Sequence, residues 1–298
     1  MSHVLIFGAS GFMGAHVRAA LAQDSRVQQV TCPGRDRCDL LAAEVDALAS
    51  LLRELGPDVV INCTGRLDGT GYQLMRANTL VTAKLIDAIA AVSPGIRFVR
   101  LGSAGEYGPI PHGRAVTEDD PAAPVSEYGL SHLAATRHLE LARAAGRVDG
   151  VTLRVFNPIG PGLPDENLLG RAAARLRDAV IGRADYISMG PLSAYRDLVD
   201  ARDVAAAVIA AALAPSLPKP VFNVGSGRAV TAREAVDLLA QAAGFTGEVR
   251  EASAAPGRSA AVNWALADIG RATEVLGWRP TYELADSIKA IWAAADAS

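Results

Sequence analysis

The sequence predicts an α/β protein built on a doubly wound parallel sheet, with a smaller C-terminal lobe. Three observations support this prediction. Short runs that are apolar on both faces alternate with stretches of helical periodicity, a glycine-rich turn follows the first run, and 298 residues suffice for one large domain with a lobe. Alternating units of this kind build parallel sheets through right-handed crossovers.

The elements of the first half follow from periodicity. We expect buried strands at 4–7, 27–31, 59–62, 98–101 and 151–156, and helices at 13–23, 43–55, 73–92 and 128–145. The segment 108–125 is rich in proline and turn formers. A loop of that length inside a domain is typical of a functional flap.

The second half has a looser rhythm. Helical periodicity predicts a helix at 168–180, then a strand at 195–200, a helix at 201–214 and a strand at 221–227. Thr231 is a suitable N-cap for the helix that follows it. Two further helices are expected near 268–276 and 284–294.

Composition excludes several classes of protein. The net charge is −3 and no run of Lys or Arg stands out, which argues against nucleic acid or an anionic membrane as the main partner. The N-terminus lacks the basic and apolar regions of a signal peptide, and no apolar run reaches the roughly 18–20 residues of a membrane span. The three cysteines match no zinc pattern. We therefore expect a cytoplasmic protein with reduced thiols and no metal.

The glycine turn predicts a dinucleotide site. Gly8, Gly11 and Gly14 follow the first strand and open the first helix. Glycines there allow a tight turn, a close approach of the backbone to a pyrophosphate and close packing of the helix. The helix N-terminus adds free N–H groups and a positive dipole for the phosphates.

A second motif lies in the helix predicted at 128–145. Tyr128 and His132 are four residues apart, so their side chains lie on one face of the helix, a turn apart. Ser103 lies just after the strand predicted at 98–101. Ligands of open α/β sheets bind at the carboxyl ends of the strands, where Ser103 and Tyr128 are both expected.

Together these segments resemble the extended short-chain dehydrogenase/reductases, in particular their nucleotide-sugar epimerase, dehydratase and reductase branch. The resemblance covers nearly the whole chain, through GASGFMG (8–14), LGSAGEYG (101–108), SEYGLS (126–131), FNPIGPG (156–162), RDLVD (196–200) and LGWRP (276–280). It implies a Rossmann domain at 1–156, with 196–224 returning to its sheet, and a substrate lobe at 157–195 and 225–298. It also implies a homodimer.

The resemblance assigns roles residue by residue. Ser103 would hold the substrate oxygen, Tyr128 would transfer the proton, and His132 would bond the nicotinamide ribose. Cofactor contacts are implied for Gly8, Gly11, Phe12, Met13, Gly14, Arg35, Asp39, Leu40, Cys63, Thr64, Gly65, Asn78, Tyr128 and His132. Substrate contacts are implied for Ser103, Asn157, Arg196 and Arg258, although Arg258 follows its Pro-Gly pair where the family's arginine precedes it.

The end of the second strand bears on the choice of cofactor. An acid there bonds the ribose 2′-hydroxyl of NAD, whereas an arginine accommodates the 2′-phosphate of NADP. Cys32 occupies the position of the acid, and Arg35 and Arg37 follow it. The sequence favours NADP with Arg35 as the phosphate ligand, while Asp36 leaves NAD open.

His132 departs from the family, which has lysine at this position. An unperturbed histidine has a pKa near 6.5 and contributes little charge at pH 7. A tyrosine that only donates a proton can do so as the neutral phenol. Our hypothesis is that histidine impairs alcohol oxidation more than ketone reduction.

The two residues after Ser103 also separate reaction types. Related dehydratases and decarboxylases have acids there, and fucose-forming epimerase-reductases have a cysteine. Ala104 and Gly105 can serve neither as acid, base nor nucleophile. Glu106 lies one place further and is expected to point elsewhere.

These features favour an NADP-dependent reductase of a keto group on a nucleotide-linked 4-keto-6-deoxy sugar. Three alternatives stay open. They are a nucleotide-sugar epimerase with tightly bound NAD, a reductase of a non-nucleotide natural-product ketone, and a weakly catalytic cofactor-binding protein. The shifted Arg258 motivates the second, and the lost lysine motivates the third.

Overall fold

Six parallel strands form the central sheet of the computed structural model, which describes residues 2–252 and 262–296. The strand order is β10-β5-β4-β3-β1-β2. The strands are β1 (Ser2–Phe7), β2 (Val27–Thr31), β3 (Val59–Asn62), β4 (Arg97–Ser103), β5 (Asp149–Val155) and β10 (Val221–Val224). The chain leaves β1 for β2 on one side and reaches β3 on the other. The predicted doubly wound sheet is confirmed, and the gap between the ends of β1 and β3 is its ligand-binding switch point.

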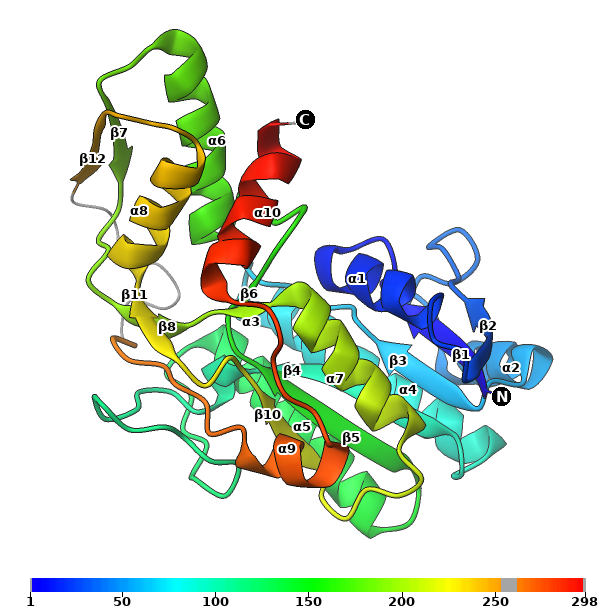
Figure 1. Cartoon of the computed structure of the whole chain (residues 1–298). Helices are drawn as coiled ribbons and strands as arrows, with labels where there is room; N and C mark the ends of the chain where they lie inside the picture. The colour runs from blue at the N-terminus through cyan, green and yellow to red at the C-terminus, as the bar shows by residue number, and fades with distance from the viewer. Residues whose placement is uncertain (1, 253–261, 297–298) are drawn as a thin grey trace.

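Helices cover both faces of this sheet (Figure 1). α1 (Phe12–Leu21) packs with α7 (Ala201–Leu213), and α2 (Val45–Leu55) packs with α4 (Val81–Val92) beside α5 (Glu127–Ala144). Along β1, Val4 and Ile6 join the first core cluster, while Leu5 and Phe7 join the second. Successive strand residues point to opposite faces, so a strand between two helix layers must be apolar throughout.

The helix predicted at 73–92 is less regular than its periodicity suggests. It begins as α3 (Gly71–Leu74), continues as a π-helical segment η1 (Met75–Leu80) and ends as α4. Thr70 caps its start in a reciprocal pair with Gln73. π-Helical turns occur frequently at functional sites, and this one contains the buried Asn78.

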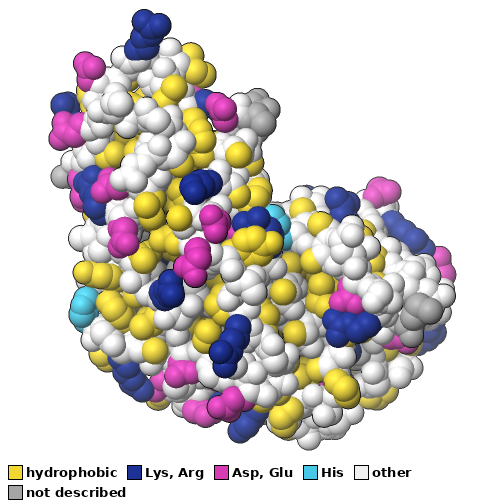
Figure 2. Space-filling view, viewed as in Figure 1, with side chains coloured by type: hydrophobic (Ala, Val, Ile, Leu, Met, Phe, Trp, Pro, Cys, Tyr) yellow, Lys and Arg dark blue, Asp and Glu magenta, His cyan; other side chains and the backbone are white. Residues whose placement is uncertain are grey.

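The lobe has its own apolar core. It is built on α6 (Leu168–Gly182), α8 (Ala232–Ala242) and α10 (Leu284–Asp296), with β7 (Tyr186–Met189) paired in parallel to β12 (Glu248–Glu251). The predicted cap is present, since the Thr231 side chain accepts a hydrogen bond from Glu234 N. Figure 2 shows the lobe rising from the body of the molecule, which leaves an inner corner between the two.

Short strand pairs join the lobe to the sheet. The strand predicted at 195–200 is split into β8 (Tyr195–Asp197), which pairs with β11 (Ala229–Thr231), and β9 (Val199–Asp200), which pairs with β6 (Pro158–Ile159). A short 3₁₀ turn, η2 (Ala104–Glu106), follows β4.

The C-terminal segment divides its packing between the two parts. α9 (Gly270–Leu276) contacts β10 and α7, and Ala272 and Trp278 belong to the sheet's core cluster, although the sequence analysis assigns them to the lobe. α9 thus extends the body, while α10 belongs to the lobe. No helix within the described ranges is long and apolar enough to cross a membrane.

Candidate active site

The glycine turn at the end of β1 has room for a phosphate group. Gly8 has φ +80°, and a Cβ on it would lie 2.9 Å from the backbone of Cys63 and Thr64. A Cβ on Gly14 would lie 1.9 Å from Gly8 O, so only glycine lets α1 pack this closely. A Cβ on Gly11 would meet nothing nearer than 3.5 Å, and Gly11 N-caps α1 without a side-chain bond. The N-terminus of α1 therefore has no side-chain cap, and an uncapped helix N-terminus suits a pyrophosphate.

Some of the other residues predicted to contact the cofactor near this turn are exposed, and others are packed against the protein. Phe12 lies edge-on to His16, and Met13 packs against the core. Thr64 is held by Asn62 Oδ1, which accepts bonds from its N and Oγ1 and shapes the turn that leads to the exposed Gly65. Burial raises the pKa of the Cys63 thiol to about 12, so Cys63 is no thiolate nucleophile near neutrality.

The loop after β2 presents two arginines to solvent, Arg35 and Arg37. Arg37 also forms an ion pair of 2.6 Å with Glu54. Asp39 accepts a hydrogen bond from Leu41 N, and Leu40 is buried in the second core cluster. The role of Arg35 as a phosphate ligand stays a prediction.

Ser103 and Tyr128 flank a single glycine at the end of β4. A Cβ on Gly105 would lie 3.3 Å from Ser103 Oγ and 3.4 Å from Tyr128 Cε1. Ser103 Oγ accepts a hydrogen bond from Gly105 N at 3.1 Å, and an accepting hydroxyl can still donate its own proton. Ser126 N-caps α5 and places Tyr128 in its first turn. The structure thus brings together the two residues that the sequence assigned to proton transfer.

The side chains of Glu106 and Tyr107 point away from the space between Ser103 and Tyr128. Glu106 is fully buried and accepts bonds from Ser103 N and Arg154 Nε, at 3.1 and 2.8 Å. The hydroxyl of Tyr107 donates to Asn223 Oδ1 at 2.6 Å, and burial raises the pKa of this tyrosine to about 12. Neither residue is available as an acid or base for a ligand beside Tyr128.

His132 lies against Tyr128 and against a buried arginine. The ring centroids of Tyr128 and His132 are 4.6 Å apart. Nδ1 of His132 is 3.1 Å from Nη2 of Arg100, a residue of β4 that the sequence analysis did not select. Burial, followed by the charge of Arg100, lowers the pKa of His132 well below its usual value. The only signal in the sequence was a charged residue within the apolar run at 98–101.

Asn78 connects the loop after β3 to α5, the helix that contains Tyr128. Its Oδ1 accepts a bond from Arg66 N, and its Nδ2 donates to Arg66 O and to Ser131 Oγ, both at 3.0 Å. Ser131 Oγ in turn donates to Tyr128 O. Asn78 therefore positions the loop after β3 and the first turn of α5 relative to each other.

The predicted substrate residues lie where the lobe meets the sheet. Asn157 Nδ2 donates to Asp197 O at 3.0 Å, and Arg196 donates to Tyr195 O. Burial lowers the pKa of Arg196, as is expected of a guanidinium drawn into a site. Arg258 lies outside the described residues.

An aromatic cluster borders this region. Trp264 packs against Tyr195 and His112, with ring centroids 5.1 and 4.3 Å away, and its indole N–H donates to Arg114 O. The long loop 108–125 is also tied to the C-terminal segment through Val116, which bridges to Ala267. The segment predicted as a flap is thus anchored along its middle.

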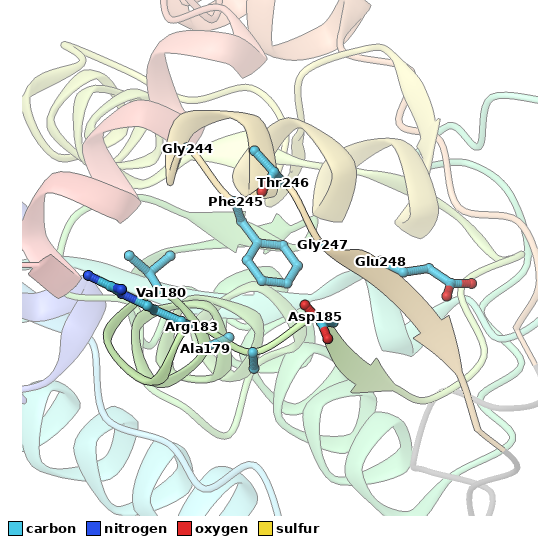
Figure 3. Close-up of a pocket in the computed structure, with 10 residues that line it drawn as sticks. Ala179, Val180, Arg183, Asp185, Gly244, Phe245, Thr246, Gly247 and Glu248 are labelled. Atoms are coloured by element: carbon cyan, nitrogen blue, oxygen red, sulfur yellow. The ribbon is translucent and has the colours of Figure 1, made fainter.

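A separate hollow of about 770 Å³ lies at the far end of the lobe, between the end of α6 and the loop after α8. Figure 3 shows the ring of Phe245 in its centre, with Arg183 and Glu248 pointing away from each other. Arg183, Asp185, Thr246 and Glu248 line it beside Phe245, and none of the predicted site residues that the structure describes is among its lining residues. The hollow is therefore not a candidate for the catalytic site.

Comparison with known proteins agrees with this geometry. The NAD dependent epimerase/dehydratase family matches residues 4–225. A dTDP-6-deoxy-L-talose 4-dehydrogenase (NAD(P)(+)) of Kitasatospora kifunensis is 39% identical, over 98% of this chain and 95% of its own. A GDP-6-deoxy-D-mannose reductase of Pseudomonas aeruginosa is 29% identical, over 97% and 95%. The structure of RMD from Pseudomonas aeruginosa complexed with NADPH superimposes with a TM-score of 0.88 at 26% identity, over 100% of both chains.

Proposed function

Because the chain belongs to the NAD-dependent epimerase/dehydratase family, we propose that it is an NAD(P)-dependent reductase of a keto group on a nucleotide-linked sugar. The specific substrate class that we propose is a 4-keto-6-deoxy sugar. The observation that carries the proposal is that Ser103 and Tyr128 flank Gly105, while the buried carboxylate of Glu106 in the same turn is engaged by Ser103 N and Arg154 Nε. Such a site supports simple hydride transfer better than elimination.

The cofactor is held, in this proposal, by the glycine turn and the ends of β1 and β3. The open N-terminus of α1 would take the pyrophosphate, and the exposed Arg35 would take the 2′-phosphate of NADPH. The similar Pseudomonas aeruginosa structure contains NADPH, which supports this choice. When bound, NADPH supplies the hydride that reduces the keto carbon.

The protein's own residues manage the oxygen. Ser103 donates its hydroxyl proton in a hydrogen bond that holds and polarises the carbonyl. Tyr128 gives its proton to that oxygen as negative charge develops there, so the ketone gains a hydride and a proton and becomes an alcohol. His132 contributes a neutral N–H donor beside Tyr128 and holds no proton for transfer.

The nucleotide-sugar assignment is supported by the lobe. Arg196 is half-buried and precedes Asp197, whose backbone carbonyl accepts a hydrogen bond from Asn157. A guanidinium pairs well with diphosphate oxygens. The Kitasatospora kifunensis relative is named for oxidation at position 4 of a dTDP-6-deoxy sugar. A 4-dehydrogenase and a 4-ketoreductase run the same hydride transfer in opposite directions. The role of Arg258 stays a prediction.

The test is a cofactor and substrate panel with the purified protein. We expect NADPH to be consumed with a dTDP-linked 4-keto-6-deoxy sugar, and dTDP-6-deoxy-L-talose to reduce NADP⁺ in the reverse direction. Bound NAD released on denaturation, together with interconversion of UDP-glucose and UDP-galactose without added cofactor, would show an epimerase instead. Turnover of simple ketones but of no nucleotide sugar would remove the nucleotide from the proposal.

We extend the proposal to a cytoplasmic homodimer that forms through α5. Leu130 and Leu141 are exposed, by 48% and 72%, and their separation of three helical turns places them on one face of the helix. Exposed apolar side chains that share a face are typical of an interface. Light scattering should give twice the chain mass, and Leu141→Glu should lower it.

A further inference from the structure

A buried arginine lies behind the proton-transfer residues. Arg100 is in β4, three residues before Ser103, and 2% of its side chain is exposed. Its Nη2 is 3.1 Å from His132 Nδ1, and its Nη1 donates to Thr136 Oγ1 at 2.8 Å. Arg100 therefore ties β4 to the face of α5 that carries Tyr128.

This contact determines which nitrogen of His132 carries the proton. A guanidinium has five N–H donors and no acceptor, so Nδ1 of His132 must accept. The neutral ring then carries its hydrogen on Nε2. Protonation of Nδ1 would set an N–H against the N–H of Arg100, in a place with little water. His132 is held as a neutral ring with one defined donor.

The charges around Arg100 do not cancel. Glu106 is fully buried between two arginines, with Oε2 at 2.8 Å from Arg154 Nε and Oε1 at 3.9 Å from Arg100 Nη1. Two guanidinium groups and one carboxylate leave one positive charge in this cluster. Since Arg154 holds the carboxylate more closely, Arg100 is the less compensated of the two.

That charge acts on the catalytic tyrosine. From α5, His132 and Thr136 contact Arg100, and Tyr128 packs on the His132 ring with centroids 4.6 Å apart. Glu106 and Arg154 interact with Arg100 from the turn after β4 and from β5. Burial lowers the pKa of Arg100, whereas Glu106 and then Tyr128 raise it. An arginine starts from a pKa above 12 and keeps its charge. The attraction between Arg100 and the Tyr128 phenolate is mutual, so it favours the phenolate.

We propose that Arg100 is a positioning residue of the active site that holds His132 as the Nε2–H tautomer and supplies the fixed positive charge beside Tyr128. The ammonium group of a lysine at position 132 could supply both a hydrogen bond and a positive charge. In this protein His132 donates the hydrogen bond and Arg100 provides the charge. The proposal rests on the proposed function, because it assigns Arg100 to the proton step of that reaction.

The first test does not depend on any substrate. Protein labelled with ¹⁵N in histidine reports the tautomer of His132 by NMR, with the signal assigned through His132→Gln. The wild type should show a protonated Nε2 and a bare Nδ1 that persist well below pH 6.5. A protonated Nδ1, or an imidazolium near pH 6.5, would overturn the proposal without the need for any Arg100 variant.

The second test measures the phenolate directly. The absorbance of tyrosinate against pH, compared with Tyr128→Phe, gives the ionisation midpoint of Tyr128. A nearby opposite charge lowers an acid's pKa, so the midpoint should rise in Arg100→Met. Arg100→Lys keeps a cation and should bring the midpoint back toward wild type.

Arg154→Met is the matched control. Arg154 shares Glu106 with Arg100 but has no bond to His132, so its loss should leave the His132 tautomer as Nε2–H. With NADP⁺ and dTDP-6-deoxy-L-talose, the rising limb of the pH–rate profile should move up in Arg100→Met as the phenolate midpoint does. An unchanged midpoint in Arg100→Met would overturn the proposal. Absence of turnover in all variants, with both spectroscopic results as expected, would instead refute the proposed function.

Discussion

Nη2 of Arg100 lies 3.1 Å from Nδ1 of His132, so a buried permanent cation contacts the histidine that lies one helical turn after Tyr128. Without this contact, His132 is a weak substitute for a lysine. With it, His132 can remain neutral, because Arg100, which contacts the histidine ring, supplies the positive charge. This relationship changes what we expect when the usual lysine is restored.

His132→Lys should lower the rate in both directions, because a second cation would face Arg100 in a buried site. The loss should be about tenfold or more, since buried like charges are costly. In the double variant with Arg100→Met that conflict is gone, and the rate should exceed that of Arg100→Met alone. Steady-state rates of the four proteins form a double-mutant cycle. A gain confined to oxidation in His132→Lys alone would restore the simpler hypothesis that His132 merely lacks charge.

Tyr128→Phe removes the proton donor and keeps the ring against Gly105. General acid catalysis contributes about 10²–10⁴-fold, so kcat should fall by that factor. NADPH affinity, followed by quenching of protein fluorescence, should change little. Tyr107→Phe is the control, because the Tyr107 hydroxyl bonds Asn223 and not the gap beside Ser103. Equal losses in both variants would show that Tyr128 acts only through structure.

Gly105→Ala should disturb both proton-transfer residues at once. The added Cβ would lie 3.3 Å from Ser103 Oγ and 3.4 Å from Tyr128 Cε1, so one of them must shift. Small misplacements of reacting groups cost up to about 100-fold, and we expect kcat/KM to fall by about 10- to 100-fold. A Cβ on Gly182 meets nothing within 4 Å, so Gly182→Ala should leave kcat/KM at its wild-type value.

Arg35→Ala should raise the KM for NADPH by about 10- to 100-fold, the range expected for one lost charge-assisted hydrogen bond. The KM for NADH should not move, because NADH has no 2′-phosphate. Arg37→Ala serves as the control, since Arg37 is engaged with Glu54. If both cofactors weakened equally in Arg35→Ala, Arg35 would not be reading the 2′-phosphate.

His132 should make the fold less stable in mild acid. Burial lowers its pKa in the folded state, so between that value and about 6.5 the unfolded chain binds the proton more readily. The contribution of His132 is therefore complete above about pH 6.5 and is lost as the pH falls toward the folded pKa. Urea unfolding at pH 7, 6 and 5 should give a shallower pH dependence for His132→Gln, by up to about 1.4 kcal/mol per pH unit. A pH dependence in His132→Gln as steep as that of the wild type would contradict this prediction.

The interior of the site shows where prediction from the sequence ends. Ser103, Tyr128 and the glycine turn were predictable, because strand ends, helix spacing and turn chemistry are local properties. The role of Asn78 as a link to Ser131 was not, since it depends on a π-helical segment inside a helix that the periodicity presents as regular. Nor did the sequence show that Ala272 packs with the sheet, because an apolar helix face does not specify its partner.

By itself, the sequence determined the doubly wound sheet and the positions of Ser103 and Tyr128 along it. Periodicity assigns each residue a face, and the spacing of Tyr128 and His132 places both on one side of a helix. Only the tertiary structure decided what stands behind them. Arg100 and His132 are 32 residues apart, and they meet because α5 crosses the face of β4 to which the Arg100 side chain points. A lone arginine in an apolar strand has no such meaning until the sheet order and the helix packing supply its partner.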